Sequence, residues 1–498
     1  QIVGEPGDGT PLILDHDHLY LARFHKYERE VADLISARNQ SVEDIDEALL
    51  RTGLEDEFRD SENDRQKLAT FLALSRQLCI ITGGPGTGKT STVVRILELL
   101  LGALPTLRFH LAAPTGKAAM QLSQSIASHG GAINPEVQTL HRLLGMRRDG
   151  RTFRHGPDLP IPTDLLIVDE ASMIDLPMMH RLLGALPAAT RLILLGDPNQ
   201  LPSVDTGNVL ADLCRGDNGL SAELARQAEP LVGAVPLSAI PSKLTNAVCE
   251  LTKSYRFTKT SGIGRLAAAI KKGETSLVKS EDGTVTLLDS YDSERMLDYW
   301  QDYMTLMQTE GTKASDLLRI FEQTRFLCSR REGKSGAITI NNTIESALSS
   351  MNLKPQDEDF YHGRPILVTN NDYNLGLFNG DIGICMAVES PNKYQVHFSD
   401  GRKFLASRLP SHESCFAMTV HKAQGSEFDQ VVLIIAEESG TAADQLLNRE
   451  LLYTAVTRAR SSIVIVGDSM NWRRGMGRSA ARTSGMTKFL QSETYEQK

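Results

Sequence analysis

A glycine-rich stretch, GGPGTGKT at residues 83–90, constrains the fold of this chain more than any other feature. The apolar segment LCIIT (78–82) precedes it, and STVVRILELL, which has a helical pattern, follows it. The order of strand, G-x4-G-K-T and helix is that of a P-loop, whose backbone N–H groups surround a phosphate at the start of a helix. A glycine-rich turn before a helix is the alternative, but the correct flanks on both sides favour the P-loop.

A P-loop predicts which residues contact a nucleoside triphosphate. Its lysine neutralises the charge of the β- and γ-phosphates, and the hydroxyl of the next residue holds Mg²⁺. Lys89 and Thr90 have these predicted roles here, so ATP and Mg²⁺ are the expected cofactors. The predicted nucleotide-binding residues of the loop are Gly83, Gly84, Pro85, Gly86, Thr87, Gly88, Lys89, Thr90 and Ser91.

Alternating strand and helix patterns predict an α/β protein. Apolar segments of strand length occur at 78–82, 108–113, 164–169 and 191–197, and again at 325–329, 431–435 and 462–468. Continuous apolar strands with helices between them predict parallel sheets covered on both faces, with ligands at the carboxyl ends of the strands. At about 355–410 the pattern changes to short strands separated by Gly, Asn and Asp turns, which predicts a small β-barrel inserted in the second sheet domain.

Two of the predicted strands end in candidate catalytic residues. Asp169 and Glu170 follow the apolar run LLIV; Asp169 is expected to hold Mg²⁺ through water, and Glu170 to polarise the attacking water. Gln200 lies in GDPNQ after the next strand, where its amide is expected to sense the γ-phosphate. The structural alternatives are an acidic helix cap for the first pair and a simple Asx turn for the second motif.

Three further residues complete the predicted ATP site. Gln66 precedes the loop, and its amide offers the donor and acceptor that fit the edge of adenine. Arg256 in KSYRF and Arg458 in TAVTRAR are interpreted as cations that a second domain supplies to the γ-phosphate. Taken alone, each would be read as an ordinary surface residue.

Composition sets the class of protein. With 498 residues, 41% of them hydrophobic and 23% charged, the chain suits a soluble protein of about three domains in the cytoplasm. No apolar run approaches the roughly 18 residues of a membrane span. Six scattered cysteines without a CxxC pair indicate free thiols, and a net charge of −9 argues against a protein that simply coats nucleic acid.

The first residue is glutamine, from which we expect that an N-terminal part of the gene product is missing.

Eight motifs occur in a fixed order along the chain: GGPGTGKT, APTGKAA, TLHRLLG, VDEASMID, GDPNQLPSV, KSYRF, AMTVHKAQGSEFD and LLYTAVTRAR. This order resembles that of superfamily 1 DNA helicases. The residues within the motifs are most similar to those of the RecD family, the alpha subunits of RecBCD enzymes (exodeoxyribonuclease V). The resemblance covers about residues 10–470. It implies ATP-driven 5′→3′ translocation on single-stranded DNA and action on double-stranded DNA ends in recombinational repair. It also implies RecB-like and RecC-like partner subunits.

The resemblance also implies a domain plan. Residues 1–62 would be a remnant of an N-terminal region, and residues 63–250 a first RecA-like domain with a hairpin at 145–162. Residues 251–354 and 411–498 would form a second RecA-like domain, interrupted at 355–410 by an SH3-like β-barrel.

The same resemblance places residues on DNA. Thr115, Gly116 and Lys117 in APTGKAA would begin a helix whose N–H groups bind a DNA phosphate, with ordinary helix capping as the alternative. His141 and Arg142 in TLHRLLG belong to the next motif that is similar to a DNA-facing one.

A basic hairpin follows these motifs. The Asp-Gly pair at 149–150 is a turn signal, and Arg147, Arg148, Arg151 and Arg154 flank it. In similar helicases a hairpin at this place meets the duplex junction, so we interpret it as a separation pin. A solvated hairpin with charged faces is the alternative.

Two further segments carry predicted DNA contacts. In LGLFNGDIG, Phe378 would stack a base beside a tight turn at Asn379, although a core phenylalanine is an equally good interpretation. In TVHKAQGSEFD (419–429), the resemblance places Thr419 and His421 toward DNA. It places Gly425 and Glu427 of the same stretch toward the nucleotide, so that this loop would couple the two ligands.

Three other functions remain to be compared with a helicase subunit. A nuclease is disfavoured because no compact Asp/Glu/Lys cluster occurs beyond the ATP site, and we expect the cleavage centre in a partner chain. A non-catalytic scaffold is disfavoured because the ATP-site residues are intact. A stand-alone RecD-like helicase, working without RecB and RecC, is the closest alternative.

Overall fold

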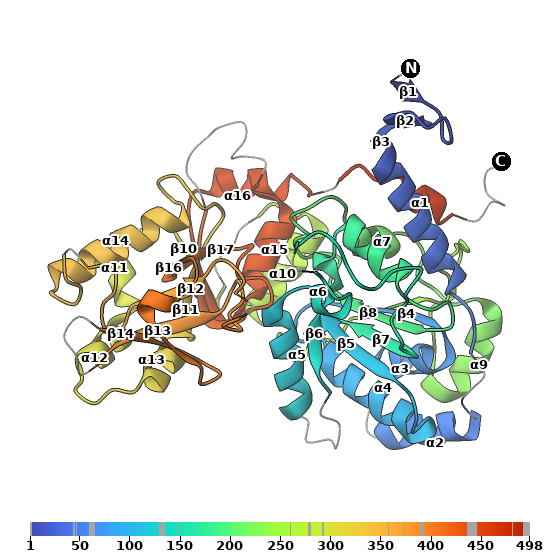
Figure 1. Cartoon of the computed structure of the whole chain (residues 1–498), viewed down its shortest axis with the longest axis horizontal. Helices are drawn as coiled ribbons and strands as arrows, with labels where there is room; N and C mark the ends of the chain where they lie inside the picture. The colour runs from blue at the N-terminus through green and yellow to red at the C-terminus, as the bar shows by residue number, and fades with distance from the viewer. Residues whose placement is uncertain are drawn as a thin grey trace. The chain divides into compact units, whose positions relative to one another are not determined.

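The computed structural model describes residues 2–42, 45, 47–58, 65–128, 135–147, 149–258, 260–276, 280–290, 293–356, 358–372, 374–388, 393–435, 446–480 and 482–491. Contacts among these residues divide the chain into two compact units, shown in Figure 1. Unit 1 comprises Gln1–Arg256 and Ala481–Lys498, and unit 2 comprises Phe257–Ala480.

A parallel sheet forms the centre of unit 1. In the described part of this unit, six strands lie in the order β6-β5-β7-β8-β4-β9, and every neighbouring pair is parallel. The strands are β4 (Leu78–Gly83), β5 (Phe109–Ala113), β6 (Val137–Thr139), β7 (Leu165–Val168), β8 (Arg191–Gly196) and β9 (Val248–Leu251). The four strands predicted in this part of the chain are confirmed, and the P-loop strand β4 lies directly beside β8.

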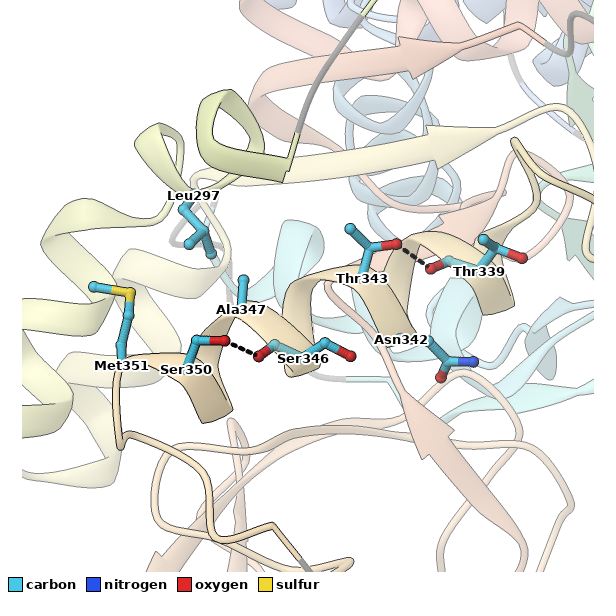
Figure 2. A pocket seen from close by; sticks show the side chains of 8 residues that line it. All are labelled: Leu297, Thr339, Asn342, Thr343, Ser346, Ala347, Ser350 and Met351. Atoms are coloured by element: carbon cyan, nitrogen blue, oxygen red, sulfur yellow. Dashed lines mark hydrogen bonds between the residues drawn. The ribbon is translucent and has the colours of Figure 1, made fainter.

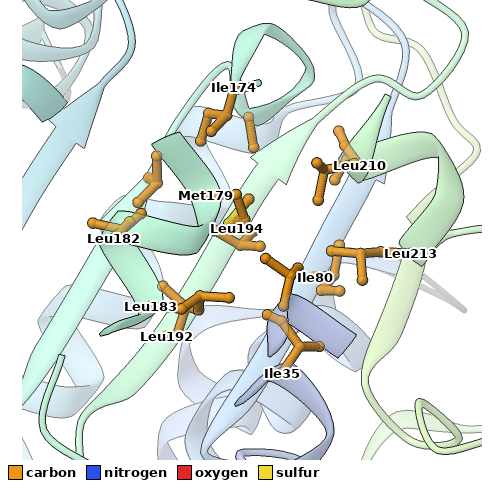
Figure 3. Packing of buried hydrophobic residues seen from close by; sticks show 14 of the residues in the cluster. Ile35, Ile80, Ile174, Met179, Leu182, Leu183, Leu192, Leu194, Leu210 and Leu213 are labelled. Carbon is orange, nitrogen blue, oxygen red and sulfur yellow. The ribbon is translucent and has the colours of Figure 1, made fainter. Parts of the chain in front are cut away.

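Helices cover both faces of this sheet, as continuous apolar strands require. The helices of unit 1 are α1 (Ala22–Ala37), α2 (Glu47–Glu57), α3 (Arg65–Ser75), α4 (Lys89–Ala103), α5 (Gly116–Ser128), α6 (Leu140–Leu143), α7 (Leu176–Gly184), α8 (Val209–Leu213), α9 (Ala222–Val232) and α17 (Met486–Phe489), with a 3₁₀ turn at Ala171–Met173. Successive residues of one strand enter different cores: Ile80 packs with α1 and α7, and Ile81 packs with α3 and α4. Figure 3 shows the first core, with Ile80 beside Ile35 and Leu194 beside Met179.

The N-terminal segment is part of unit 1. Strands β1 (Val3–Gly4), β2 (Leu12–Asp15) and β3 (His18–Leu21) form a small sheet that leads into α1. Val31 and Ile35 of α1 and Leu54 of α2 are fully buried in the two cores. The predicted division at residue 62 therefore does not separate two compact units.

A second parallel sheet forms the centre of unit 2. Among its described residues, five strands lie in the order β10-β19-β18-β11-β17. The strands are β10 (Val285–Leu288), β11 (Thr324–Cys328), β17 (Ala417–Thr419), β18 (Phe428–Ile434) and β19 (Ala459–Val466). The helices are α10 (Gly262–Lys272), α11 (Ser293–Asp298), α12 (Gln301–Gln308), α13 (Ala314–Phe321), α14 (Ala337–Ser350), α15 (Arg449–Thr457) and α16 (Ser469–Met476). The three strands predicted here, at 325–329, 431–435 and 462–468, correspond to β11, β18 and β19.

An antiparallel sheet interrupts unit 2 between α14 and β17. Its strands are β12 (Pro365–Val368), β13 (Ile382–Ala387), β14 (Tyr394–Phe398), β15 (Lys403–Leu405) and β16 (His412–Ser414), with a 3₁₀ turn at Ala406–Arg408. They pair in the order β15-β14-β13-β12-β16 around a small core that includes Ile366, Cys385 and Val396. The inserted β-structure is confirmed, and its closure into an SH3-like barrel stays a prediction.

An open groove of about 670 Å³ runs along α14 in unit 2. Figure 2 shows Ala347 of this helix pointing toward Leu297, which comes from α11. The side chains that line the groove include none of the predicted site residues. Within the described ranges, no helix has the length and apolar character needed to cross a membrane.

Candidate nucleotide and nucleic-acid sites

The P-loop has the backbone that its sequence requires. β4 ends at Gly83 and α4 begins at Lys89, with Gly86 and Gly88 at positive φ values of 75° and 82°. L-residues with side chains rarely adopt this conformation. A Cβ atom at Gly83 would lie 2.6 Å from Oγ1 of Thr87, so a side chain there would displace the loop. These glycines let the backbone bend closely enough to direct N–H groups into the loop.

The ammonium group of Lys89 lies within the P-loop. Its Nζ atom donates to the carbonyl oxygens of Gly83 at 2.7 Å and Gly84 at 3.3 Å. Thr90 follows in the first turn of α4. The lysine is thus held at the mouth of the loop, where a phosphate would bind, and its role and that of Thr90 remain predictions.

Gln66 of α3 contacts the P-loop directly. Its Nε2 atom donates to the carbonyl oxygens of Thr87 at 3.1 Å and Gly88 at 3.4 Å, and its Oε1 atom accepts from Arg95 at 3.1 Å. The side chain is 4% exposed, which excludes the alternative of a surface helix residue. Sequence reasoning missed Arg95, which lies on α4. Only the packing of α3 against α4 brings its side chain to Gln66.

Asp169 and Glu170 follow the end of β7. The backbone N–H of Glu170 donates to Oδ1 of Asp169 at 2.8 Å, and Glu170 itself has a positive φ of 53°. Such a backbone is uncommon for a residue with a side chain and is frequent at functional sites. Burial and the negative charge of Glu170 together raise the pKa of Asp169 to about 6, although the positive charge of Lys89 opposes them. Asp169 and Lys89 follow β7 and β4, strands of the same parallel sheet.

Gln200 is held beside the same sheet edge. It is 5% exposed, and its Nε2 atom donates to Oδ2 of Asp197 at 3.4 Å. Asp197 also accepts from the backbone N–H of Asn199 at 3.0 Å, so the Asx turn named as an alternative is present. The turn and a sensor role are compatible, because the turn directs Gln200 inward. Asp197, which holds the Gln200 side chain, was not among the predicted site residues.

Arg256 does not come from a second domain, which corrects the prediction. It is the last residue of this part of unit 1 and packs on the P-loop. A Cβ atom at Gly86 would lie 2.4 Å from the Cβ of Arg256, and the N–H of Tyr255 donates to the carbonyl of Gly86 at 2.7 Å. The chain reaches this position because β9 pairs with β4, which places the residues after β9 beside the loop after β4.

Thr115 caps a helix, as the structural alternative stated. Its Oγ1 atom accepts from the backbone N–H of Ala118 at 3.2 Å, at the start of α5. Gly116 and Lys117 are the first residues of this helix. Capping and phosphate binding use different N–H groups, so the DNA-binding prediction stands beside the cap.

The segment after β6 combines an anchored aromatic ring with exposed cations. Phe153 packs on the core of unit 1 and lies 6.2 Å from the ring of His141, whose pKa burial lowers. Arg142 is exposed and pairs with Glu136 at 2.9 Å. The ring of Phe153 therefore belongs to the hairpin base rather than to its outer surface.

The predicted hairpin is present in short form. The N–H of Arg147 donates to the carbonyl of Thr152 at 2.9 Å, and Gly150 turns the chain with a φ of 66°. Asp149 accepts from the N–H groups of Arg151 and Thr152, each at 2.9 Å. Arg147, Arg151 and Arg154 are exposed, whereas Arg148 lies outside the described residues.

The loop after β17 in unit 2 holds the residues of TVHKAQGSEFD. Thr419 caps the turn by accepting from the N–H of Lys422 at 3.3 Å, and Gly425 has a φ of 70°. His421 is half-buried, and burial lowers its pKa. Glu427 pairs with Arg460 at 3.3 Å. The loop is thus a compact turn before β18, and its ligands remain predicted.

Two other predicted residues of unit 2 differ in burial. Arg458 is 3% exposed, which excludes an ordinary surface arginine. Phe378 is half-buried and lies outside the core of the inserted sheet, while the next residue, Asn379, is exposed. The core alternative for Phe378 is therefore not supported, because its neighbour Leu377 occupies that core instead.

The donor set in unit 1 fits Mg²⁺. Among the described residues, no cluster of three or more His, Cys, Asp or Glu side chains could hold a metal. Mg²⁺ in nucleotide sites needs no such cluster, because one or two carboxylates, water and the substrate phosphates complete its octahedral shell. Asp169 at the end of β7 would provide the carboxylate, and Thr90 at the start of α4 would provide a hydroxyl.

Comparisons with known proteins agree with this geometry. A family model described as an AAA domain matches residues 66–206, and one described as a UvrD-like helicase C-terminal domain matches residues 414–466. The RecBCD enzyme subunit RecD of Haemophilus influenzae is 36% identical over 87% of this chain and 73% of its own length. That of Mycolicibacterium smegmatis is 35% identical over 98% of this chain and 84% of its own length.

More distant proteins also match. The ATP-dependent RecD2 DNA helicase of Deinococcus radiodurans is 30% identical over 80% of this chain and 48% of its own length. A solved structure of two coordinating Pif1 helicases at forked double-stranded DNA aligns with 81% of this chain and 92% of its own, at 18% identity and a TM-score of 0.44. On the identity and coverage of the RecBCD subunits, the chain belongs to the RecD family of RecBCD enzyme subunits.

Proposed function

We propose that this chain is an ATP-dependent DNA helicase subunit of a RecBCD-type complex, which translocates 5′→3′ on single-stranded DNA and unwinds double-stranded ends for recombinational repair. One observation carries the proposal most strongly. Lys89, Asp169 and Gln200 follow β4, β7 and β8, which are neighbours in one parallel sheet, so their side chains share its carboxyl edge. A chain of the RecD family that retains this set has the parts of a working ATPase.

Within the proposed site each residue has a role. Lys89 neutralises the β- and γ-phosphates, Gln66 reads adenine, and Glu170 polarises the attacking water. Gln200 senses the γ-phosphate, while Arg256 and Arg458 act on its developing negative charge. Mg²⁺, held by Thr90 and Asp169, would neutralise charge on the phosphate oxygens.

The DNA side of the proposal uses both units. Thr115, Gly116 and Lys117 bind a DNA phosphate, and the basic hairpin meets the duplex junction. In unit 2, Thr419, His421 and Phe378 contact the strand, with Phe378 stacking on a base at the rim of an SH3-like barrel. Because Thr419 and Glu427 belong to one short loop, nucleotide-dependent movement of that loop would alter its hold on DNA.

The proposed partners are RecB-like and RecC-like subunits, with the nuclease centre in one of them. The names of the relatives support this assembly, since they are described as subunits of the RecBCD enzyme. A stand-alone helicase is the second candidate, supported by the 30% identity to the RecD2 helicase.

Two measurements test the proposal. The purified chain should hydrolyse ATP faster when single-stranded DNA is added and should separate a DNA fork with a 5′ overhang. ATP hydrolysis that DNA does not stimulate would contradict a helicase and favour a scaffold. Affinity purification from the source cells separates the two candidates, because RecB-like and RecC-like chains should accompany a complex subunit and be missing from a stand-alone enzyme.

A further inference from the structure

The C-terminal segment (residues 482–491) belongs to unit 1, although the sequence assigned residues 411–498 to the second domain. The chain leaves unit 1 after Arg256 and returns to it at Ala481. Met486 and Leu490 are buried in the core that α1 and α8 share. Hydrogen bonds secure both ends of α17: the N–H of Gly485 donates to Oε2 of Glu28 at 2.9 Å, and the N–H of Lys243 donates to the carbonyl of Leu490 at 3.0 Å. The segment is therefore anchored on unit 1.

The guanidinium of Arg482 is surrounded by carbonyl oxygens from one loop. Its Nη2 atom donates to Ser203 at 2.8 Å and to Val204 at 3.1 Å. Its Nη1 atom donates to Gly207 at 3.0 Å and also to Asp205. Carbonyl dipoles that converge on one point repel one another, and a planar fork of N–H donors is the side chain that can satisfy four of them together. Arg482 thus stabilises the curved shape of this loop.

The loop in question begins at Gln200. Leu201 and Pro202 are the only residues between Gln200 and Ser203, and Leu201 is buried at 3% exposure. The N–H of Leu176 donates to the carbonyl of Thr206 at 2.9 Å, which fixes the far side of the loop to α7. Because Leu201 and Pro202 form a short link, the shape of the loop determines where the Gln200 amide lies.

We propose that Arg482 is a positioning residue of the ATPase site, which holds the loop after Gln200 in the shape that directs Gln200 at the γ-phosphate. The inference rests on the proposed function, because that function gives Gln200 its role. The chain passes between the two units twice, and its second passage leads to the C-terminal segment. That segment would thus contact a loop of the ATPase site.

The test compares Arg482→Ala, Arg482→Gln and Arg482→Lys with Lys488→Ala, an exposed residue of the same segment. We measure kcat and KM for ATP hydrolysis in the full chain at a saturating single-stranded oligonucleotide, together with the melting temperature. Arg482→Ala should lower kcat by about tenfold and change KM for ATP by less than about threefold, because Gln200 acts in the transition state. Arg482→Lys should retain an intermediate kcat, and Lys488→Ala a wild-type kcat.

A folded Arg482→Ala protein with a wild-type kcat would overturn the proposal, even if its melting temperature fell. If Arg482→Ala does not fold, Arg482→Gln decides: its amide keeps two donors, and a folded variant with a wild-type kcat would also overturn the proposal. A wild-type chain without DNA-stimulated ATP hydrolysis would overturn the proposed function and this inference together.

Discussion

Nη1 of Arg458 donates to the carbonyl oxygen of Ser426 at 3.1 Å, which joins the end of α15 to the turn that contains Gly425 and Glu427. Nε of the same side chain donates to the carbonyl of Thr454 at 3.3 Å. A residue predicted to act on ATP is thus also a structural link within unit 2. Its substitution must affect stability as well as hydrolysis.

Arg458→Ala should lower the free energy of unfolding of unit 2 by about 1–3 kcal/mol, because it removes the charged donor from two buried carbonyl groups. It should also reduce DNA-stimulated ATP hydrolysis, assayed at a temperature where the variant remains folded. Arg460→Ala is the matched control: Arg460 is exposed, and its substitution should change stability by less than about 0.5 kcal/mol. Equal stability of the two variants in urea would contradict the structural role of Arg458.

Lys89→Gln should leave the fold intact and lower the rate of ATP hydrolysis by at least about 100-fold, because a neutral amide cannot neutralise the phosphates. Lys313→Gln makes the same chemical change at an exposed position of unit 2 and should have a wild-type rate. A Lys89→Gln protein with normal turnover would contradict the assignment of the P-loop.

Asp169 should make both activity and stability depend on pH near 6, the value to which burial raises its pKa. The ionised form is the one that holds Mg²⁺, so kcat/KM for ATP should fall as the pH drops below about 6. A carboxyl group with a raised folded-state pKa favours folding below its unfolded pKa, and this contribution is lost as the pH rises through 6. Asp169→Asn should therefore be more stable than wild type at pH 7.5, by on the order of 1 kcal/mol, and should melt at a higher temperature.

Asp164→Asn is a control of opposite sign for the melting experiment. Arg108 donates to Asp164 at 2.6 Å and lowers the pKa of that carboxyl group to about 2. This substitution should lower the melting temperature at pH 7.5, and the loss should disappear only as the pH falls from about 4 toward 2. An Asp169→Asn protein that melts below wild type at pH 7.5 would show that the carboxyl group is not destabilised by its surroundings.

Replacing Arg147, Arg148, Arg151 and Arg154 with alanine should abolish fork unwinding while preserving ATP hydrolysis at saturating single-stranded DNA. The affinity for DNA should fall and depend less steeply on salt. Binding would release about 0.7–0.9 fewer counterions for each phosphate contact that is lost. Alanine substitution of Arg226 and Arg319, exposed arginines outside the predicted interface, provides the control. Unchanged unwinding and DNA affinity in the fourfold variant would eliminate the pin interpretation.

Phe378→Ala should weaken binding of single-stranded DNA by about 1–3 kcal/mol, the usual value of a base stacked on an aromatic ring. The melting temperature should change little, because Phe378 lies outside the core of the inserted sheet. Phe404→Ala is the contrasting variant, since Phe404 packs on that core and its loss should lower stability. If Phe378→Ala reduces stability without affecting DNA affinity, Phe378 is a core residue after all.

Local signals explain why much of the fold could be predicted. The apolar runs that form β4, β7 and β8 are buried on both faces of the sheet, so each run alone indicates a central parallel strand. The glycines of the P-loop were predictable for an equally local reason, because Gly86 and Gly88 adopt backbone angles that other residues avoid. A strand end also indicates a site, which is why Asp169 and Gln200 could be named before the structure was known.

By itself, the sequence determined the α/β class, the strands that carry the site and the resemblance to the RecD family. Each of these depends on residues that lie close together in the chain. Tertiary structure alone decided that Arg256 packs on Gly86, that Gln66 bonds to the P-loop backbone, and that Arg482 returns to unit 1. Each of these depends on which strands pair and which helices pack, and those pairings arise from the summed burial of many side chains rather than from any local pattern.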